Sequence, residues 1–138
     1  MIAARYLLPA SAALVFATPA FAAPEAITGN WKTDDGKAVI QFYKCGGDMC
    51  GKISRFLVPE PAGGARDDNN PDKAKRSRAL KGLPIFWSLS ENGSKYKGKG
   101  YSPEEGRYFN AQVWRAGNTL KVQGCVAVFC KTVTFTKV

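Results

Sequence analysis

The chain has 138 residues, of which 20 are lysine or arginine and 11 are aspartate or glutamate, and it contains no histidine. The formal net charge of +9 would favour nucleic acid as a partner in a cytosolic protein. The N-terminal segment predicts export, however, so we expect no nucleic-acid partner. Without histidine, the chain lacks the commonest general base and the commonest activator of a nucleophile.

Residues 1–22 have the organisation of a secretory signal peptide. Arg5 precedes an uncharged apolar stretch, and residues 20–22 read Ala-Phe-Ala, an A-x-A cleavage motif. The stretch is too short for a membrane anchor, and prolines interrupt it, so we expect no integral membrane protein. We predict that residues 23–138 form one exported domain, in the periplasm of a Gram-negative bacterium.

Turn signals come at short, regular intervals after residue 30, which is typical of an all-β protein. Because most links are short, successive strands should be antiparallel neighbours. We predict an all-β fold, an eight-stranded up-and-down antiparallel barrel, since closing such a sheet removes its exposed edges. The expected strands span residues 30–33, 37–45, 50–57, 83–90, 94–101, 107–115, 118–125 and 130–137.

Alternation of apolar and polar residues predicts which side chains face the barrel interior. These residues are Ile40, Phe42, Ile53, Leu57, Phe109, Ala111, Val113, Leu120, Val122, Val133 and Phe135. Phe86 and Trp87 are adjacent in one strand, so they must point to opposite faces. We predict that Phe42, Phe109 and Phe135 contribute to a site for a small, partly apolar ligand.

Arg55 has the same strand parity as Ile53 and Leu57, which would place a charge on an apolar face. Either Arg55 lies at a barrel mouth with its aliphatic part against apolar residues, or it binds an anionic group of a ligand. Arg55 is therefore included in the hypothetical ligand site, which could then accept an anionic molecule.

The long connection over residues 58–82 is predicted to carry a short helix over residues 71–81. Asn70 would be its N-cap, Pro71 its first residue, and Gly82 would follow its end. The helix would carry a basic patch, formed by Lys73, Lys75, Arg76, Arg78 and Lys81. This patch suggests an alternative function, an interaction module that docks on anionic lipid, polymer or protein of the cell envelope.

All 11 acidic residues fall in expected turns, loops or tails, so no pair of carboxylates is predicted to face the interior. We therefore expect no catalytic residue, no cofactor and no metal site. Asp68, Asn70 and Asp72 resemble the start of a calcium loop, but Lys73 stands where such a loop requires glycine. We interpret these residues as an Asx turn and a helix cap.

The four cysteines form two pairs of equal spacing, Cys45 with Cys50 and Cys125 with Cys130. Three connectivities are available to four cysteines, and zinc is an alternative to disulfides, but an exported chain favours disulfides. Each pair flanks the four-residue loop of a predicted hairpin, "GGDM" in one case and "VAVF" in the other. We therefore predict local disulfides, Cys45–Cys50 and Cys125–Cys130.

The sequence "GNWKT" at residues 29–33 resembles the G-x-W opening of lipocalins, whose tryptophan closes one barrel end beneath a basic residue of the last strand. Trp31 and Lys137 match these two parts. The resemblance therefore implies a barrel-closing pair in which the Lys137 cation lies over the Trp31 indole.

A longer resemblance covers residues 29–138. The segments "YKCGGDMCGKI", "DDNNPDKAKRSRALKGLPI", "GKGYSPEEGRYFNA", "NTLKVQGC" and "CKTVTFTKV" occur in this order. Together they are similar to the exported bacterial family called domain of unknown function 2147, from which the chain departs at Ala79 and Ser102 and in the ending "TFTK". This resemblance implies a lipocalin-like barrel in the envelope and brings no established activity.

Overall fold

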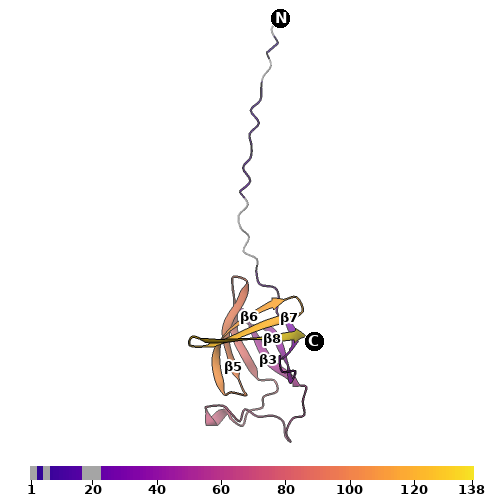
Figure 1. Cartoon of the computed structure of the whole chain (residues 1–138), viewed down its shortest axis with the longest axis vertical. Coiled ribbons are helices and arrows are strands. Elements are labelled where there is room, and N and C mark those ends of the chain that lie inside the picture. The colour runs from indigo at the N-terminus through magenta and orange to yellow at the C-terminus, as the bar shows by residue number, and fades with distance from the viewer. Residues whose placement is uncertain (1–2, 5–6, 17–22) are drawn as a thin grey trace.

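The computed structural model describes residues 3–4, 7–16 and 23–138. The strands form one closed antiparallel barrel (Figure 1). Each strand pairs with the next, and the last pairs with the first. They are β1 (Gly29–Lys32), β2 (Ala38–Cys45), β3 (Asp48–Phe56), β4 (Pro84–Asn92), β5 (Lys95–Ser102), β6 (Arg107–Ala116), β7 (Thr119–Val126) and β8 (Phe129–Lys137). The predicted cleavage point after Ala22 lies outside the described residues. Among the described residues, none forms a helix with the length and hydropathy needed to cross a membrane.

The predicted barrel and all eight of its strands are confirmed, and the strand ends differ from the predicted ones by two residues at most. Tight turns that need a positive φ angle explain why the strand boundaries can be predicted from the sequence. Gly93 and Gly117, with φ of 63° and 64°, occupy the turns that join β4 to β5 and β6 to β7. Side-chain-bearing residues avoid this backbone conformation, so glycine marks these turns in the sequence.

The barrel interior holds the predicted apolar side chains, with one exception. Buried or half-buried within it are Ile40, Phe42, Ile53, Phe109, Ala111, Val113, Leu120, Val122, Val133 and Phe135. Phe86 is the buried member of the Phe86–Trp87 pair. Trp87 is half-buried and packs edge to face against Tyr108, with 6.1 Å between the ring centroids. The exception is Leu57, which is 40% exposed.

A β-bulge near the end of β3 explains this exception. The pairing of β2 with β3 shifts between Val39 and Ile40, so that Ser54 becomes an extra residue in β3. One extra residue exchanges the inward and outward positions that follow it. The predicted inward parity of Arg55 and Leu57 is therefore wrong, and both side chains are exposed.

The predicted helix over residues 71–81 is also wrong, because this segment contains only a single 3-10 turn, η1 (Lys73–Lys75). Asp72 rather than Asn70 caps the turn, and its carboxylate accepts a hydrogen bond from the Ala74 N–H. No residue of η1 is buried, so no apolar face supports a longer helix at this position.

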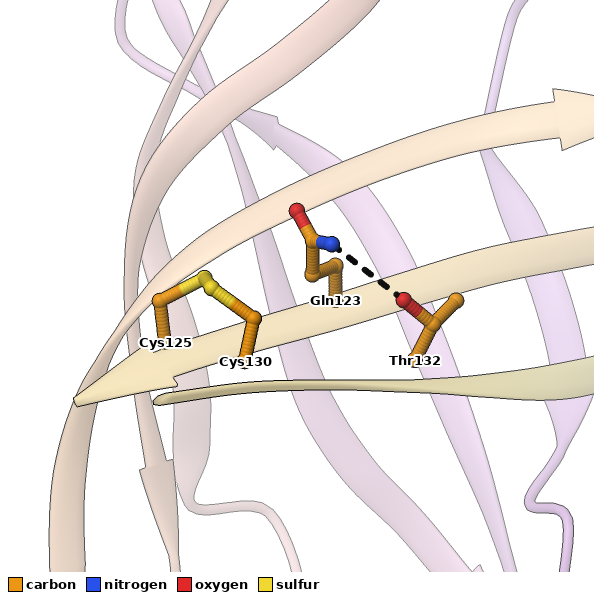
Figure 2. Close-up of a disulfide and its surroundings, with 4 residues drawn as sticks. All are labelled: Gln123, Cys125, Cys130 and Thr132. Carbon is orange, nitrogen blue, oxygen red and sulfur yellow. Dashed lines mark hydrogen bonds between the residues drawn. A yellow bond between two sulfur atoms is a disulfide. The ribbon is translucent and has the colours of Figure 1, made fainter. Parts of the chain in front are cut away.

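Both predicted disulfides are confirmed, Cys45–Cys50 across the β2–β3 hairpin and Cys125–Cys130 across the β7–β8 hairpin. Figure 2 shows the second, where Cys125 and Cys130 are directly opposite each other in neighbouring strands. The chain-entropy model assigns about 2 kcal/mol to the closure of so short a loop. Each disulfide is therefore a local cross-link between the two strands of one hairpin, next to its turn.

Candidate functional site

A cavity of about 940 Å³ opens at the barrel end that carries the long β3–β4 loop, residues 57–83. Inside the barrel its walls are apolar, formed by Ile40, Ile53, Ile85, Phe86, Phe109, Val122, Val133 and Phe135. Its rim combines the β1–β2 turn, the long loop, the β5–β6 turn and the β7–β8 hairpin. A cavity of this volume and lining has the dimensions of small-molecule sites.

The structure brings together only part of the hypothetical ligand site. Phe109 and Phe135 line the cavity. Phe42 is fully buried behind Phe86, with 5.3 Å between the ring centroids, so it supports the wall without lining it. Arg55 is exposed on the outside and is not among the lining residues.

The rim of the cavity carries charges of both signs. Lys37 and Glu104 form an exposed salt bridge across it at 4.0 Å. The lining includes the carboxylates of Asp34, Asp35, Glu60, Glu104 and Glu105, and the cations of Lys37, Arg107 and Lys131. Carboxylates thus outnumber cations at this mouth, although the whole chain is strongly positive.

Asp67, in the long loop, is a fully buried carboxylate that the sequence analysis missed. It accepts hydrogen bonds from the Tyr101 hydroxyl at 2.6 Å, from the Asn70 amide at 2.8 Å and from Arg78 Nε at 2.8 Å. Asn70 is also fully buried, and its side-chain oxygen accepts from the Asp72 N–H. We call Asp67, Asn70, Arg78 and Tyr101 the Asp67 cluster.

The pKa values of the two acidic groups in this cluster move apart. Burial alone would raise the pKa of Asp67, but the hydrogen bonds from Tyr101, Asn70 and Arg78 outweigh it and hold the pKa below the ordinary value of 3.8. The pKa of Tyr101 is raised from 10.0 to about 12, mainly by burial and next by the hydrogen bond to the Asp67 carboxylate. At neutral pH the pair is therefore an ionised carboxylate and a neutral phenol.

The Asp67 cluster pins the long loop onto β5. Tyr101 belongs to β5, whereas the other three members belong to the loop. Ala65 and Leu80, which flank the cluster in the loop, line the cavity and are joined by a backbone hydrogen bond of 3.0 Å. The cluster therefore fixes one wall of the cavity mouth. No sequence signal could identify it, because Tyr101 lies 34 residues from Asp67.

The predicted basic patch divides into two groups. Arg78 binds Asp67, and Arg76 Nε donates to the Asn70 carbonyl at 2.8 Å, so these two arginines hold the loop together. Lys73, Lys75 and Lys81 are exposed, and no salt bridge within the described part of the chain engages them. Within the predicted patch, these three lysines are the cations that no hydrogen bond or salt bridge of the described residues engages.

Trp31 is fully buried at the opposite end of the barrel, and its indole N–H donates to the Ile27 carbonyl at 2.9 Å. The cation over its ring is Arg115 of β6, with 5.3 Å from the guanidinium carbon to the ring centroid. Lys137 pairs with Trp31 in the strand register, but its side chain is exposed. The predicted pair of Trp31 with Lys137 is therefore corrected to Trp31 with Arg115, because β6 ends beside this tryptophan.

The described residues contain no group of three or more cysteine, aspartate or glutamate side chains that could hold a metal ion.

No curated protein matches the chain. A solved structure, described as "Protein HP1028 from the human pathogen Helicobacter pylori belongs to the lipocalin family", is similar in fold, with a TM-score of 0.72. The two sequences are 21% identical, and the match covers 82% of this chain and 83% of that chain. Residues 29–137 match a family model described as "Uncharacterized protein conserved in bacteria (DUF2147)", and the chain belongs to this family.

Proposed function

We propose that the protein is an exported, non-catalytic barrel of the periplasm that binds a small, partly apolar molecule in its cavity. The observation that carries this proposal is the cavity of about 940 Å³ whose inner walls are aromatic and aliphatic. The apolar part of the molecule would contact Phe109 and Phe135, and its polar part would lie at the charged rim. The fold of the lipocalin described above supports the same proposal.

The state of the carboxylates supports a non-catalytic role. Asp67 is the buried carboxylate of the described residues, and three donors already bind its oxygens. These donors occupy three of the about four lone-pair sites of the carboxylate, and the side chain is fully buried, so the group is suited to hold structure together and not to accept a substrate proton. Export is supported by the signal-peptide sequence and by two disulfides, which persist in oxidising compartments.

Binding of the uncharged fluorescent dye phenylnaphthylamine tests the cavity directly. We expect the wild type to bind the dye saturably. Ala65→Trp should weaken binding at least about tenfold, equivalent to about 1.4 kcal/mol, because Ala65 is half-buried in the cavity wall and the indole would occupy ligand space.

Ala74→Trp provides the matched control. Ala74 lies in the same long loop, is exposed and does not line the cavity, so the same substitution there should leave dye binding unchanged. Equal binding by the wild type and both variants would show that the dye occupies another site and would contradict the proposal.

A second candidate function is docking on an anionic envelope surface through the exposed lysines of the long loop, Lys73, Lys75 and Lys81. The observation that favours it is that these three cations remain exposed while the neighbouring arginines are engaged within the loop. A cation near an anionic bilayer contributes about 1 kcal/mol to binding, and salt screens this contribution.

Sedimentation with phosphatidylglycerol vesicles tests this second function. Replacing Lys73, Lys75 and Lys81 together with glutamine should abolish salt-sensitive binding. The same change at Lys32, Lys44 and Lys97, which are exposed lysines of β1, β2 and β5, should have a smaller effect. Equal losses in the two triple variants would indicate attraction by net charge alone and would refute a docking site in the loop.

A further inference from the structure

Strand β8 has an unpaired edge beside the cavity. It pairs with β7 from Phe129 to Thr136, but with β1 only through Thr136 and Lys137. No backbone hydrogen bond of the described residues joins residues 129–135 to any other segment on the β1 side. Lys131, Val133 and Phe135 line the cavity, as do residues 33–35 of the β1–β2 turn, so the cavity extends to the unpaired stretch between this edge and that turn. We call this unpaired stretch the lateral opening.

The strand register identifies the backbone groups at this edge. Cys125 and Cys130 are opposite each other with a Cα–Cα distance of 4.1 Å, which is typical of a non-hydrogen-bonded pair in an antiparallel ladder. Because the two kinds of pair alternate, Cys130, Thr132 and Thr134 direct their N–H and C=O groups away from β7. These three residues form a row of donors and acceptors at the edge.

Large apolar side chains adjoin this row. Val128 is 86% exposed and Phe129 is 79% exposed, at the tip of the β7–β8 hairpin. Contiguous exposed apolar residues mark interaction surfaces, and an exposed strand edge pairs readily with another strand. A single partner that supplies a strand would satisfy the backbone row and cover the apolar tip together.

We propose that the partner is a second copy of this chain, with the two β8 edges paired antiparallel around a two-fold axis at Thr132. The free backbone row is then self-complementary, since Cys130 of each copy is opposite Thr134 of the other, and Thr132 is opposite its own equivalent. Each of these pairs exchanges two backbone hydrogen bonds.

The side chains fit the same register. Lys131 is opposite Val133 of the second copy, so the two Lys131 residues are diagonal neighbours and not directly opposite each other. Phe129 is opposite Phe135 of the second copy, and Phe135 lines the cavity. Phe129 of each copy therefore covers the lateral opening of the other copy's cavity, and the partner contributes a residue to the site.

Charge complementarity favours a second copy as the occupant. The β1–β2 turn lines the same cavity and carries two carboxylates, Asp34 and Asp35, against one cation, Lys37, whereas the β8 edge carries Lys131. A second β8 strand placed in the lateral opening brings its own Lys131 toward these carboxylates. The interface thus joins opposite charges, although each chain is positive overall.

Sedimentation velocity of the exported domain over a dilution series tests the proposal, which does not depend on whether the cavity holds a ligand. The wild type should sediment as a dimer at the higher concentrations, and Thr132→Pro as a monomer. Proline removes an edge N–H that makes no bond to β7, and strand edges tolerate proline.

Thr132→Val is the matched control and should remain dimeric. The Thr132 hydroxyl accepts a hydrogen bond from Gln123 at 3.3 Å on the outer face of the barrel (Figure 2), and both variants lose this bond. The two variants therefore differ in the backbone N–H, and circular dichroism checks that both are folded.

Phe129→Glu provides a second test that leaves the backbone intact. Phe129 is exposed in a single copy, so the change should not affect folding, but it should raise the dimer dissociation constant at least about tenfold. A monomeric wild type over the whole series, or a folded Thr132→Pro variant that remains dimeric, would overturn the proposal.

Discussion

Replacing Asp67 with alanine should lower the free energy of unfolding by about 3 kcal/mol, because the substitution leaves buried donors without their acceptor. The Tyr101 hydroxyl and the Asn70 amide both donate to Asp67 and are themselves buried. The loss would be measured by urea denaturation. It should be accompanied by weaker binding of phenylnaphthylamine, since the Asp67 cluster holds the loop wall of the cavity.

Asp68→Ala is the matched control for this prediction. Asp68 is the next residue in the loop and is exposed, so its replacement should change the free energy of unfolding by no more than about 0.5 kcal/mol. A similar stability for the two variants would mean that the Asp67 cluster does not hold the loop.

The same cluster gives the stability a defined pH dependence. The folded pKa of Asp67 lies below 3.8, so its stabilising contribution is complete above pH 3.8 and is lost as the pH falls through the folded pKa. The pKa of Tyr101 is raised to about 12, so the neutral phenol stabilises the fold fully below pH 10 and progressively less as the pH rises to 12. The difference in unfolding free energy between wild type and Asp67→Ala should therefore become smaller both as the pH falls below 3.8 and as it rises above 10.

Gly106→Ala should be the second strongly destabilising substitution. A Cβ at Gly106 would lie 2.0 Å from the backbone oxygen of Asn69, and the φ angle of 63° is unfavourable for alanine. The Asn69 amide in turn donates to the carbonyl of Glu104 at 3.1 Å, in the β5–β6 turn. The long loop and this turn therefore pack backbone against backbone, and we expect a loss of about 3 kcal/mol.

Gly117→Ala separates the two causes of this loss. Gly117 has almost the same φ angle, 64°, but a Cβ there would meet nothing within 4 Å. It should therefore cost only the backbone strain, about 1 kcal/mol, in the same urea measurement. Equal losses for the two glycine variants would show that the loop yields to the added methyl group and is not held against the β5–β6 turn.

The strands and disulfides could be predicted because their signals are local. The glycine turns and the alternation of Phe109, Ala111 and Val113 each lie within one hairpin or one strand. The same logic misplaces Arg55, because the bulge is a property of two paired strands and cannot be seen in either strand alone. A single extra residue was enough to move one proposed ligand contact to the outside of the barrel.

The long loop shows the second limit of sequence reasoning. Asn70 and Gly82 have the residue types of helix ends, but the Asn70 side chain is bound to Asp67 and to the Asp72 N–H. The loop is shaped by contacts with β5, 34 residues away, and not by helix propensity. The same limit applies at the barrel end where Trp31 lies, because the cation over Trp31 comes from β6 and not from the last strand.

Native mass spectrometry of the protein purified from its own host tests the central claim most directly. A barrel that binds a small molecule in the cavity should retain a discrete additional mass in the wild type and in Ala74→Trp, and should lose it in Ala65→Trp. The bare mass of the chain in all three proteins, or an additional mass that Ala65→Trp keeps, would contradict the proposed binding site.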